Sequence, residues 1–272
     1  MFYTIFAVLL RIVSNSYLNV CQKFLTNRGQ KSSVVNFYTY LGLSILILPI
    51  TSLFSVELIK YALIMGALGA LGNYFIIKAL SIGELSMLAP INSYKPIVAL
   101  IVGWVYLHEI PSGLALVGIF LIILGTYFIL DKKDSALHYK ALIYRVLALI
   151  FSGTEAIFIK KIILMSDVTI AFVYWVLAGF VFTALFVLPA RRTMKIVSYK
   201  YQILLILAVG LMQYATNFVF ARMNVSYALA LFQLSTLLSV VLGVTMFEEK
   251  HLKRKLAASL IMVAGAVVII LC

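Results

Sequence analysis

Charged and amide side chains are spaced along one face of the first apolar stretch of this chain. Arg11, Asn15, Asn19 and Lys23 follow one another at intervals of four residues. In a helix, side chains at that interval stand above one another on the same face. A charge at the centre of a membrane helix costs roughly 2.5–3.5 kcal/mol on insertion scales, so this face is expected to point into protein or a water-filled cavity. The spacing therefore predicts a polar cavity beside the first helix.

A second polar group lies in the fourth apolar stretch, where Asn92, Tyr94 and Lys95 come directly before Pro96. Proline removes a backbone donor and leaves a carbonyl one turn earlier without its partner, so this region can offer carbonyl oxygens as well. A lysine in mid-span needs a partner, either a carboxylate on another helix or an acidic group on a ligand. Lys95 is therefore the best single candidate for substrate contact, and an ion pair with Glu155 is the alternative.

Glu155 is the one acidic residue well inside a predicted span, which makes it the candidate for coupling transport to protons. The competing interpretation is that Glu155 neutralises Lys95 or Arg145. Arg11 and Arg145 occupy equivalent positions in the two halves of the chain and are further coupling candidates. Either arginine could instead extend its guanidinium to the membrane interface or serve a structural role.

Two more acids, Glu109 and Glu249, stand at the ends of predicted spans beside basic loops. A charge at a helix end costs little, so capping or pairing with a loop is their expected role. Gly66, Gly69 and Gly72 are three residues apart inside an apolar stretch. That spacing favours a smooth face for close helix packing over a nucleotide-binding loop.

Aromatic side chains on the polar spans widen the candidate site, because tyrosines can stack on a ring or cage a cation. The full set predicted to bind substrate is Asn15, Asn19, Tyr74, Asn92, Tyr94, Lys95, Tyr214 and Asn217. The sequence contains no Gly-x-Ser-x-Gly, no Gly-x-x-x-x-Gly-Lys and no His-Glu-x-x-His motif. We therefore predict no enzyme activity, no catalytic residue, no cofactor and no metal site.

The composition predicts the elements that hold these residues. Hydrophobic residues make up 64% of the 272 residues and charged residues 11%, against about 45–50% and about 25% in soluble domains. Continuous apolar blocks of roughly 20 residues predict membrane-spanning helices rather than a barrel, whose strands would alternate. The predicted spans are 2–24, 33–54, 58–79, 84–107, 112–130, 141–160, 168–189, 201–221, 225–247 and 253–271. The fold class is thus an all-α, multi-pass membrane protein of about ten helices.

The chain divides into two five-helix repeats, 1–134 and 135–272, at a polar connector. Each second span ends in Leu-Pro, and a glycine follows each of Glu109 and Glu249 sixteen positions later, at Gly125 and Gly265. Five is an odd number of spans, so the repeats are expected to be inverted relative to each other, as in many secondary transporters. Lys and Arg gather on the odd-numbered loops, which places those loops in the cytoplasm and both termini outside.

The strongest pattern runs from Lys78-Ala79-Leu80 through Pro96-Ile97-Val98-Ala99-Leu100 and Leu107-His108-Glu109 to Gly118 and Gly125. It resembles the EamA-type members of the drug/metabolite transporter superfamily. The second half repeats it more faintly, with Thr236 where the family often has proline, while Glu249, Ala258 and Gly265 keep their places. The resemblance implies carriers of small organic metabolites, amino acids among them, often exported. Family members commonly keep both termini in the cytoplasm, which conflicts with the charge count.

Together these observations favour a secondary transporter working by alternating access. The candidate cavity residues carry more positive than negative charge, with Arg11, Lys95 and Arg145 against Glu155 alone. This excess favours an amino acid-like or anionic substrate, and protons are the candidate coupling ion. The alternatives are an uptake carrier for a cationic nutrient caged by tyrosines and, from another class, a membrane scaffold or membrane enzyme. The net charge of +13 lies in short loops, and no soluble region could carry a nucleic-acid patch. The expected partners are the lipid bilayer and a small molecule, and short loops favour a bacterial inner membrane.

Overall fold

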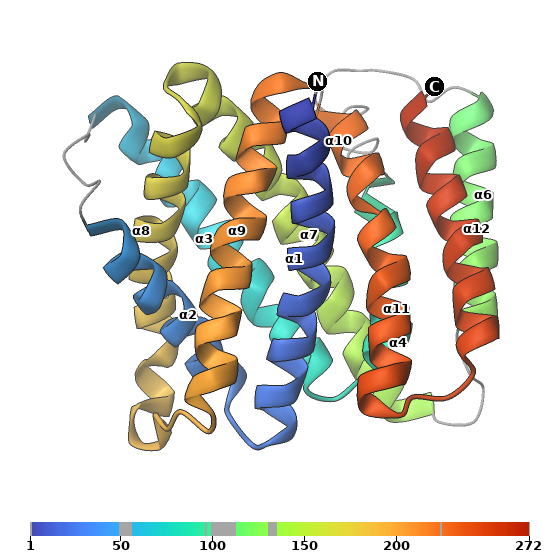
Figure 1. Cartoon of the computed structure of the whole chain (residues 1–272), viewed down its shortest axis with the longest axis horizontal. Helices are drawn as coiled ribbons and strands as arrows, with labels where there is room; N and C mark the ends of the chain where they lie inside the picture. Colours follow the sequence, from blue (N-terminus) through green and yellow to red (C-terminus); the bar gives the residue numbers. More distant parts are fainter. Residues whose placement is uncertain are drawn as a thin grey trace.

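The structure is a computed structural model that describes residues 2–48, 56–95, 97–98, 113–129, 135–223 and 225–271. All regular elements in these ranges are helical, and they stand side by side in one bundle (Figure 1). The helix α1 begins and α12 ends at the same end of the bundle, whereas α1 ends and α2 begins at the other, which we call the lower end. The elements are α1 (Phe2–Asn27), α2 (Ser32–Ile47), α3 (Val56–Leu80), α4 (Leu85–Leu88), η2 (Pro90–Tyr94), α6 (Gly113–Ile129), α7 (Ser135–Met165), α8 (Val168–Val187), η3 (Leu188–Thr193), α9 (Tyr199–Arg222), α10 (Val225–Phe232), α11 (Leu234–Phe247) and α12 (Leu252–Leu271).

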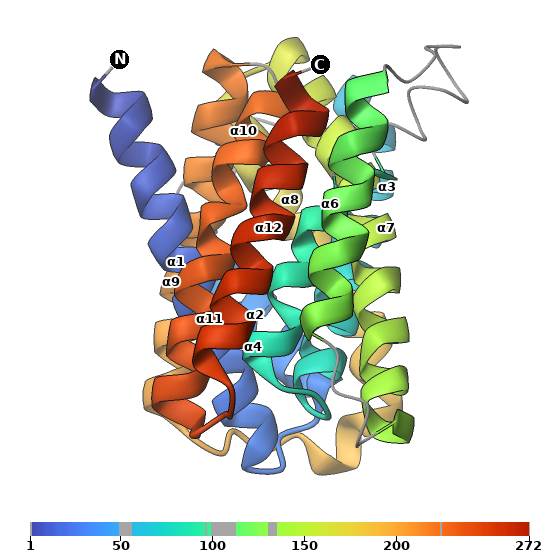
Figure 2. The ribbon, with the colours of Figure 1, turned by 90° about the vertical axis from the view of Figure 1, so that its right-hand side faces the viewer.

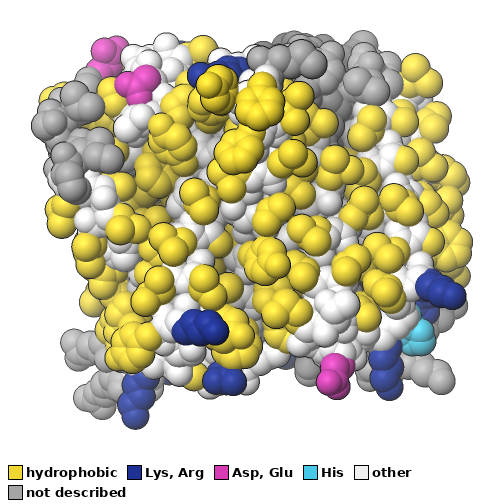
Figure 3. Space-filling model, viewed as in Figure 1, with side chains coloured by type: hydrophobic (Ala, Val, Ile, Leu, Met, Phe, Trp, Pro, Cys, Tyr) yellow, Lys and Arg dark blue, Asp and Glu magenta, His cyan; other side chains and the backbone are white. Residues whose placement is uncertain are grey.

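Length and hydropathy identify the helices that cross a membrane. Five helices in the described ranges are long and apolar enough: α1, α3, α8, α9 and the part of α7 from Tyr139 to Met165. Hydrophobic side chains cover the middle of the face drawn in Figure 3, and most charged side chains visible there lie at the two rims. The predicted fold class, a multi-pass α-helical membrane protein, is confirmed. The total of about ten spans stays a prediction, because residues 49–55 and 99–112, with Pro49 and Glu109, lie outside the described residues.

Two of the predicted spans contain an interruption within the described residues. The span predicted at 84–107 begins as α4 and continues as the 3-10 helix η2, which Pro90 opens because proline cannot donate to the preceding turn. The span predicted at 225–247 consists of α10 and α11, separated at Gln233. There the hydroxyls of Ser235 and Thr236 donate to the carbonyls of Phe232 and Gln233, each at 2.7 Å. Such hydroxyl bonds to nearby carbonyls bend helices.

Close helix packing through glycine explains how α3 lies against α7 and α8. A Cβ at Gly66 would collide with Ala178 of α8, and a Cβ at Gly69 would collide with the carboxylate of Glu155 on α7. The prediction that these glycines form a packing face is therefore confirmed. On the far side of the bundle α6 and α12 lie side by side (Figure 2). There Gly265 approaches the carbonyl of Gly118, 2.6 Å from where its Cβ would stand.

Candidate functional site

A cavity of about 90 Å³ lies in the middle of the bundle, between α1, η2, α7, α9 and α10. A buried water needs about 10–15 Å³ measured in this way, so the cavity has room for several waters or a small polar group. Its lining combines cations, one acid, amides and aromatic rings. The polar and charged residues of the lining are Arg11, Asn15, Asn19, Asn73, Asn92, Lys95, Arg145, Ser152, Glu155, Trp175, Gln213 and Thr216.

Arg11 of α1 reaches from the cavity wall to the end of α10. Its Nη1 lies 3.4 Å from the carbonyl oxygen of Phe232 and 3.3 Å from Oγ of Ser235, and donates to both. The guanidinium also stands 4.2 Å from the centre of the Phe232 ring. A helix that stops leaves its last carbonyls without a partner within the helix. Arg11 therefore satisfies one of the carbonyls exposed where the ninth predicted span is broken.

Arg145 of α7 likewise donates to a backbone carbonyl at the interruption of the other span, the one predicted at 84–107. Its Nε donates to the carbonyl oxygen of Leu88, the last residue of α4, at 3.0 Å. Arg145 is 4% exposed and Arg11 is 8% exposed. The two arginines thus occupy equivalent positions in their own halves, and each donates to a carbonyl at the helix interruption of the other half. These contacts are the kind that a structural role requires, and the part of the two arginines in coupling stays a prediction.

Lys95 differs from the two arginines because none of the residues that the structure describes is a partner of its ammonium. Among the described residues none accepts a hydrogen bond from Lys95 Nζ, and no carboxylate lies within 4.0 Å of it. The ion pair with Glu155, which was the alternative to substrate contact, is therefore not formed here, although both residues line the same cavity. The side chains of Asn19 and Asn92 likewise line the cavity without a hydrogen bond to another described side chain. These three residues leave free donors facing the cavity.

Glu155 is held at one wall by an aromatic donor. The indole Nε1 of Trp175 on α8 donates to Oε1 of Glu155 at 2.5 Å. The ring of Trp175 lies 4.9 Å from that of Tyr40, whose hydroxyl accepts a hydrogen bond from Asn73 at 2.8 Å. Glu155 is 8% exposed. Since Trp175 is its only hydrogen-bond donor among the described residues, the carboxylate keeps acceptor capacity for a proton or a ligand.

Four residues of the predicted substrate-binding set lie away from the cavity. Gln213 and Thr216 of α9 line it, so the next residue after each points about 100° further round the helix. Tyr214 is 41% exposed and contacts Thr169, and Asn217 is fully buried, accepting from Gln213 at 2.9 Å. The structure therefore does not bring these two side chains to the site.

Tyr74 and Tyr94 are also placed elsewhere. Tyr74 lines a separate hollow between α2, α3 and the end of α8, and its hydroxyl accepts from Lys78 at 3.1 Å. Tyr94 packs against the apolar cluster that contains Leu88 and Ala89. The structure thus separates the tyrosines that were predicted to surround one site. Asn15, Asn19, Asn92 and Lys95, in contrast, line the same cavity, and their role in binding substrate stays a prediction.

Sequence reasoning did not assign Trp175, Ser235 or Phe232 to the site. Trp175 is one of many aromatic residues in apolar spans, and only the need of a buried carboxylate for a donor would single it out. Phe232 contributes its backbone carbonyl and its ring. Every residue has a backbone carbonyl, so the residue type alone cannot show which carbonyl is exposed at a helix break. Oγ of Ser235 accepts a hydrogen bond from Nδ2 of Asn15 at 3.0 Å and another from Nη1 of Arg11.

The comparisons with known proteins agree with this architecture. A solved structure described as "Crystal structure of protein" aligns with a TM-score of 0.65 and 13% sequence identity, covering 96% of this chain and 95% of that chain. At that identity the likeness concerns the fold alone. None of the curated proteins compared with the chain matches it. The EamA-like transporter family matches twice, over residues 2–131 and 139–271. The predicted family resemblance is therefore confirmed: this chain belongs to the EamA-like transporter family, whose members are membrane transporters of small molecules.

Proposed function

We propose that the protein is a secondary transporter of a small, amino acid-like or anionic metabolite, which it exports by alternating access between two inverted halves. The observation that carries this proposal is the ammonium of Lys95, which lies in a central cavity without a partner among the described residues. Removing a cation from water without a partner is costly, so such a group is retained where a ligand supplies the opposite charge. A carboxylate or phosphate on the substrate would supply it.

The charges around the cavity favour the same substrate class. Three cations, Arg11, Lys95 and Arg145, face one acid, Glu155. The arginines are engaged by backbone carbonyls, which carry no full charge, so their own positive charges remain uncompensated among the described residues. An anionic group bound at Lys95 would lower this excess. Asn19 and Asn92 would then donate to the remaining oxygens of that group.

Alternating access is supported by the relation of the two halves. The family matches each half separately, and α1 and α7, which open the halves, run in opposite directions through the bundle (Figure 1). Inverted repeats place the substrate site between them near the middle of the membrane. The central cavity fits that location. We place the protein in a bacterial inner membrane, with the lower end facing the cytoplasm because the basic loops gather there.

Glu155 is the group we propose to couple transport to protons. It is buried, faces the cavity and, in the part of the chain that the structure describes, has a single donor, Trp175. When protonated it would add no charge to the cavity, and when ionised it would offset Lys95. The alternative of a cationic nutrient caged by tyrosines finds no support, since Tyr74 and Tyr214 lie outside the cavity.

Counterflow in proteoliposomes tests the proposal. Purified protein would be loaded with unlabelled compounds, amino acids and phosphorylated metabolites in turn, and uptake of the labelled compound measured. Lys95→Ala should abolish uptake of the anionic substrate, whereas Lys60→Ala, a substitution of an exposed lysine on α3 outside the cavity, should leave it unchanged. Uptake that survives Lys95→Ala would reject Lys95 as the substrate contact. Uptake of cationic compounds alone would reject the anionic class.

A further inference from the structure

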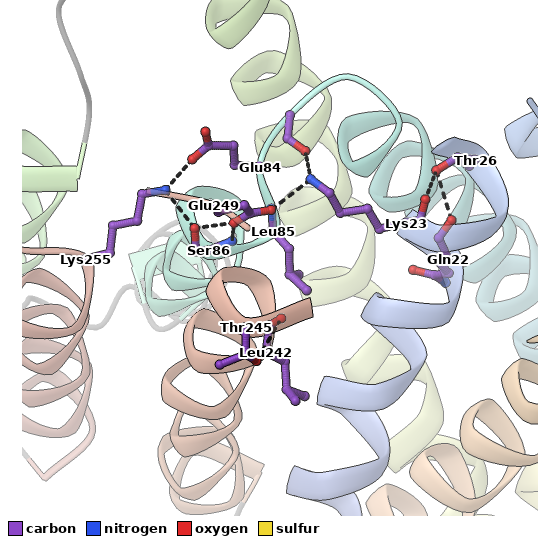
Figure 4. A network of polar contacts seen from close by, with 11 residues as sticks. Gln22, Lys23, Thr26, Glu84, Leu85, Ser86, Leu242, Thr245, Glu249 and Lys255 are labelled. Carbon is purple, nitrogen blue, oxygen red and sulfur yellow. Dashed lines mark hydrogen bonds and ion pairs between the residues drawn. The ribbon is translucent and has the colours of Figure 1, made fainter. Parts of the chain in front are cut away.

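A network of polar contacts surrounds the carboxylate of Glu249 (Figure 4). Glu249 follows α11, yet its contacts are with the start of α4, more than 160 residues earlier in the chain. Its Oε1 accepts from the backbone N–H of Leu85 and its Oε2 from the backbone N–H of Ser86, each at 2.8 Å. The hydroxyl of Ser86 donates to the same Oε2. One carboxylate thus receives three hydrogen bonds from α4.

Two lysines complete what we call the Glu249 network. Lys23, at the lower end of α1, lies 3.0 Å from Glu249 Oε1 and donates to the carbonyl of Gly83 at 2.7 Å. Lys255 of α12 donates to the Ser86 hydroxyl at 2.8 Å and pairs with Glu84. The network therefore ties α1, the start of α4, the end of α11 and the start of α12 together across the two halves.

The central ion pair of this network, Lys23 with Glu249, is buried. The side chain of Lys23 is 8% exposed and that of Glu249 is 4% exposed. Burial alone would raise the pKa of Glu249, but the charge of Lys23 and the hydrogen bonds from Ser86 outweigh it, so the pKa lies below its ordinary value. Glu249 is therefore ionised at neutral pH. A buried pair of this kind separates readily only when water can reach both charges.

The network lies directly below the cavity on the same helix face. Asn19 lines the cavity and Lys23 stands one turn further along α1. Between them Leu80, Leu85 and Leu88 fill a crevice that has no space for a water. The path from the cavity to the lower end is closed by these leucines, and the Glu249 network holds the backbone that carries two of them.

We propose that Glu249 is a positioning residue of transport: it holds α4 in the place that closes the cavity toward the lower end, and its contacts break when that end opens. The segment α4 is fixed at its start by Glu249 and at its end by Arg145, both from the second half. Directly after α4, η2 carries Asn92 and leads to Lys95. Release of Glu249 therefore frees the segment that both blocks the lower path and leads into the proposed substrate contacts.

This inference rests on alternating access, and it can be tested without any substrate. Ala156 lines the cavity from α7 and is not among the proposed substrate contacts. Ala156→Cys, made in a chain with Cys21→Ala and Cys272→Ser, would react with a membrane-impermeant maleimide only through an open path. Labelling would be followed separately in right-side-out and inside-out membrane vesicles, so that each end of the bundle is exposed to the reagent in turn.

Glu249→Gln should speed labelling from the lower end by about tenfold, because the labelling rate follows the fraction of molecules open at that end. Glu248→Gln is the matched control, since Glu248 is the neighbouring acid and its side chain is exposed. Lys23→Met should give a smaller increase, because it removes the ion pair and leaves the three hydrogen bonds from α4. It also keeps the test decisive if Glu249→Gln does not fold.

Two outcomes would overturn the proposal: labelling that is unchanged in both Glu249→Gln and Lys23→Met, or labelling that rises equally from both ends. Labelling that rises equally from both ends would show that the substitution loosens the whole bundle and that the Glu249 network only stabilises the fold. Because labelling needs no substrate, a negative counterflow result would leave this test valid. Faster labelling from the lower end in a protein without measurable counterflow would support the role of Glu249 in closing that end and would reject only the proposed substrate.

Discussion

Arg11 and Phe232 are 221 positions apart in the chain, yet the guanidinium of Arg11 donates to the Phe232 carbonyl at the break between α10 and α11. Arg145 forms the corresponding contact with Leu88 at the break between α4 and η2. Each half of the protein therefore supplies the arginine that completes the interrupted span of the other half. An interrupted membrane helix is tolerated only where its free backbone groups find partners in protein or in a water-filled cavity. The exchanged arginines provide such partners.

Arg145→Met should destabilise the fold by about 1–3 kcal/mol, because the buried Leu88 carbonyl loses its donor. Thermal unfolding in detergent would show this as a lower midpoint temperature. Arg222→Met is the control, since Arg222 is exposed and donates to Phe218 within its own helix. Equal midpoints for Arg145→Met and the unmodified protein would contradict the structural role assigned to this arginine.

Gly69→Ala should displace the Glu155 carboxylate and weaken its hydrogen bond from Trp175, because the new Cβ would stand too close to Oε1 and collide with it. Gly72→Ala should be tolerated, since its nearest neighbour is Ser152 N at 3.4 Å, an ordinary contact. Trp175 emission, recorded with Trp104→Phe in the background, would report the change in the indole environment. The same emission shift in both alanine variants would argue against specific placement of Glu155 by Gly69.

Glu155→Gln should remove the response of transport to a pH gradient while leaving uptake without a gradient measurable. The amide preserves size and can still accept from Trp175, but it cannot take up or release a proton. Counterflow and gradient-driven uptake of the same labelled substrate in proteoliposomes would separate the two effects. A pH response that persists in Glu155→Gln would assign coupling to another group.

Acid should lower the stability of the folded protein by protonating Glu249. Its pKa in the folded protein is lower than the ordinary value of 4.5. Its ionised form therefore contributes stability that is fully present above about pH 4.5 and is lost as the pH falls through the folded pKa. The difference in unfolding midpoint between the unmodified protein and Glu249→Gln should be constant near neutral pH and shrink below about pH 4.5. A difference that does not change with pH would contradict the lowered pKa.

The sequence alone was enough to predict the membrane-spanning helices and part of the site. Apolar blocks of spanning length are a local property, since a bilayer leaves the backbone no other partner than its own helix. The four-residue spacing of Arg11, Asn15 and Asn19 likewise fixes one helix face, whatever packs against it. For the same reason Lys95 and Glu155 stood out, because a charge inside a span must face protein or water.

Only the tertiary structure decided which groups meet. The sequence left open whether Lys95 contacts substrate or pairs with Glu155. In the described residues the two charges do not lie within 4.0 Å of each other, and the carboxylate of Glu155 accepts from Trp175 instead. The fold also directs Tyr214 to the surface and joins Glu249 to Lys23 and α4. These outcomes depend on contacts between helices distant in the chain, on their rotation and on backbone carbonyls exposed at helix breaks. Residue types do not record those quantities, because any buried charge can be satisfied by several partners until packing selects one.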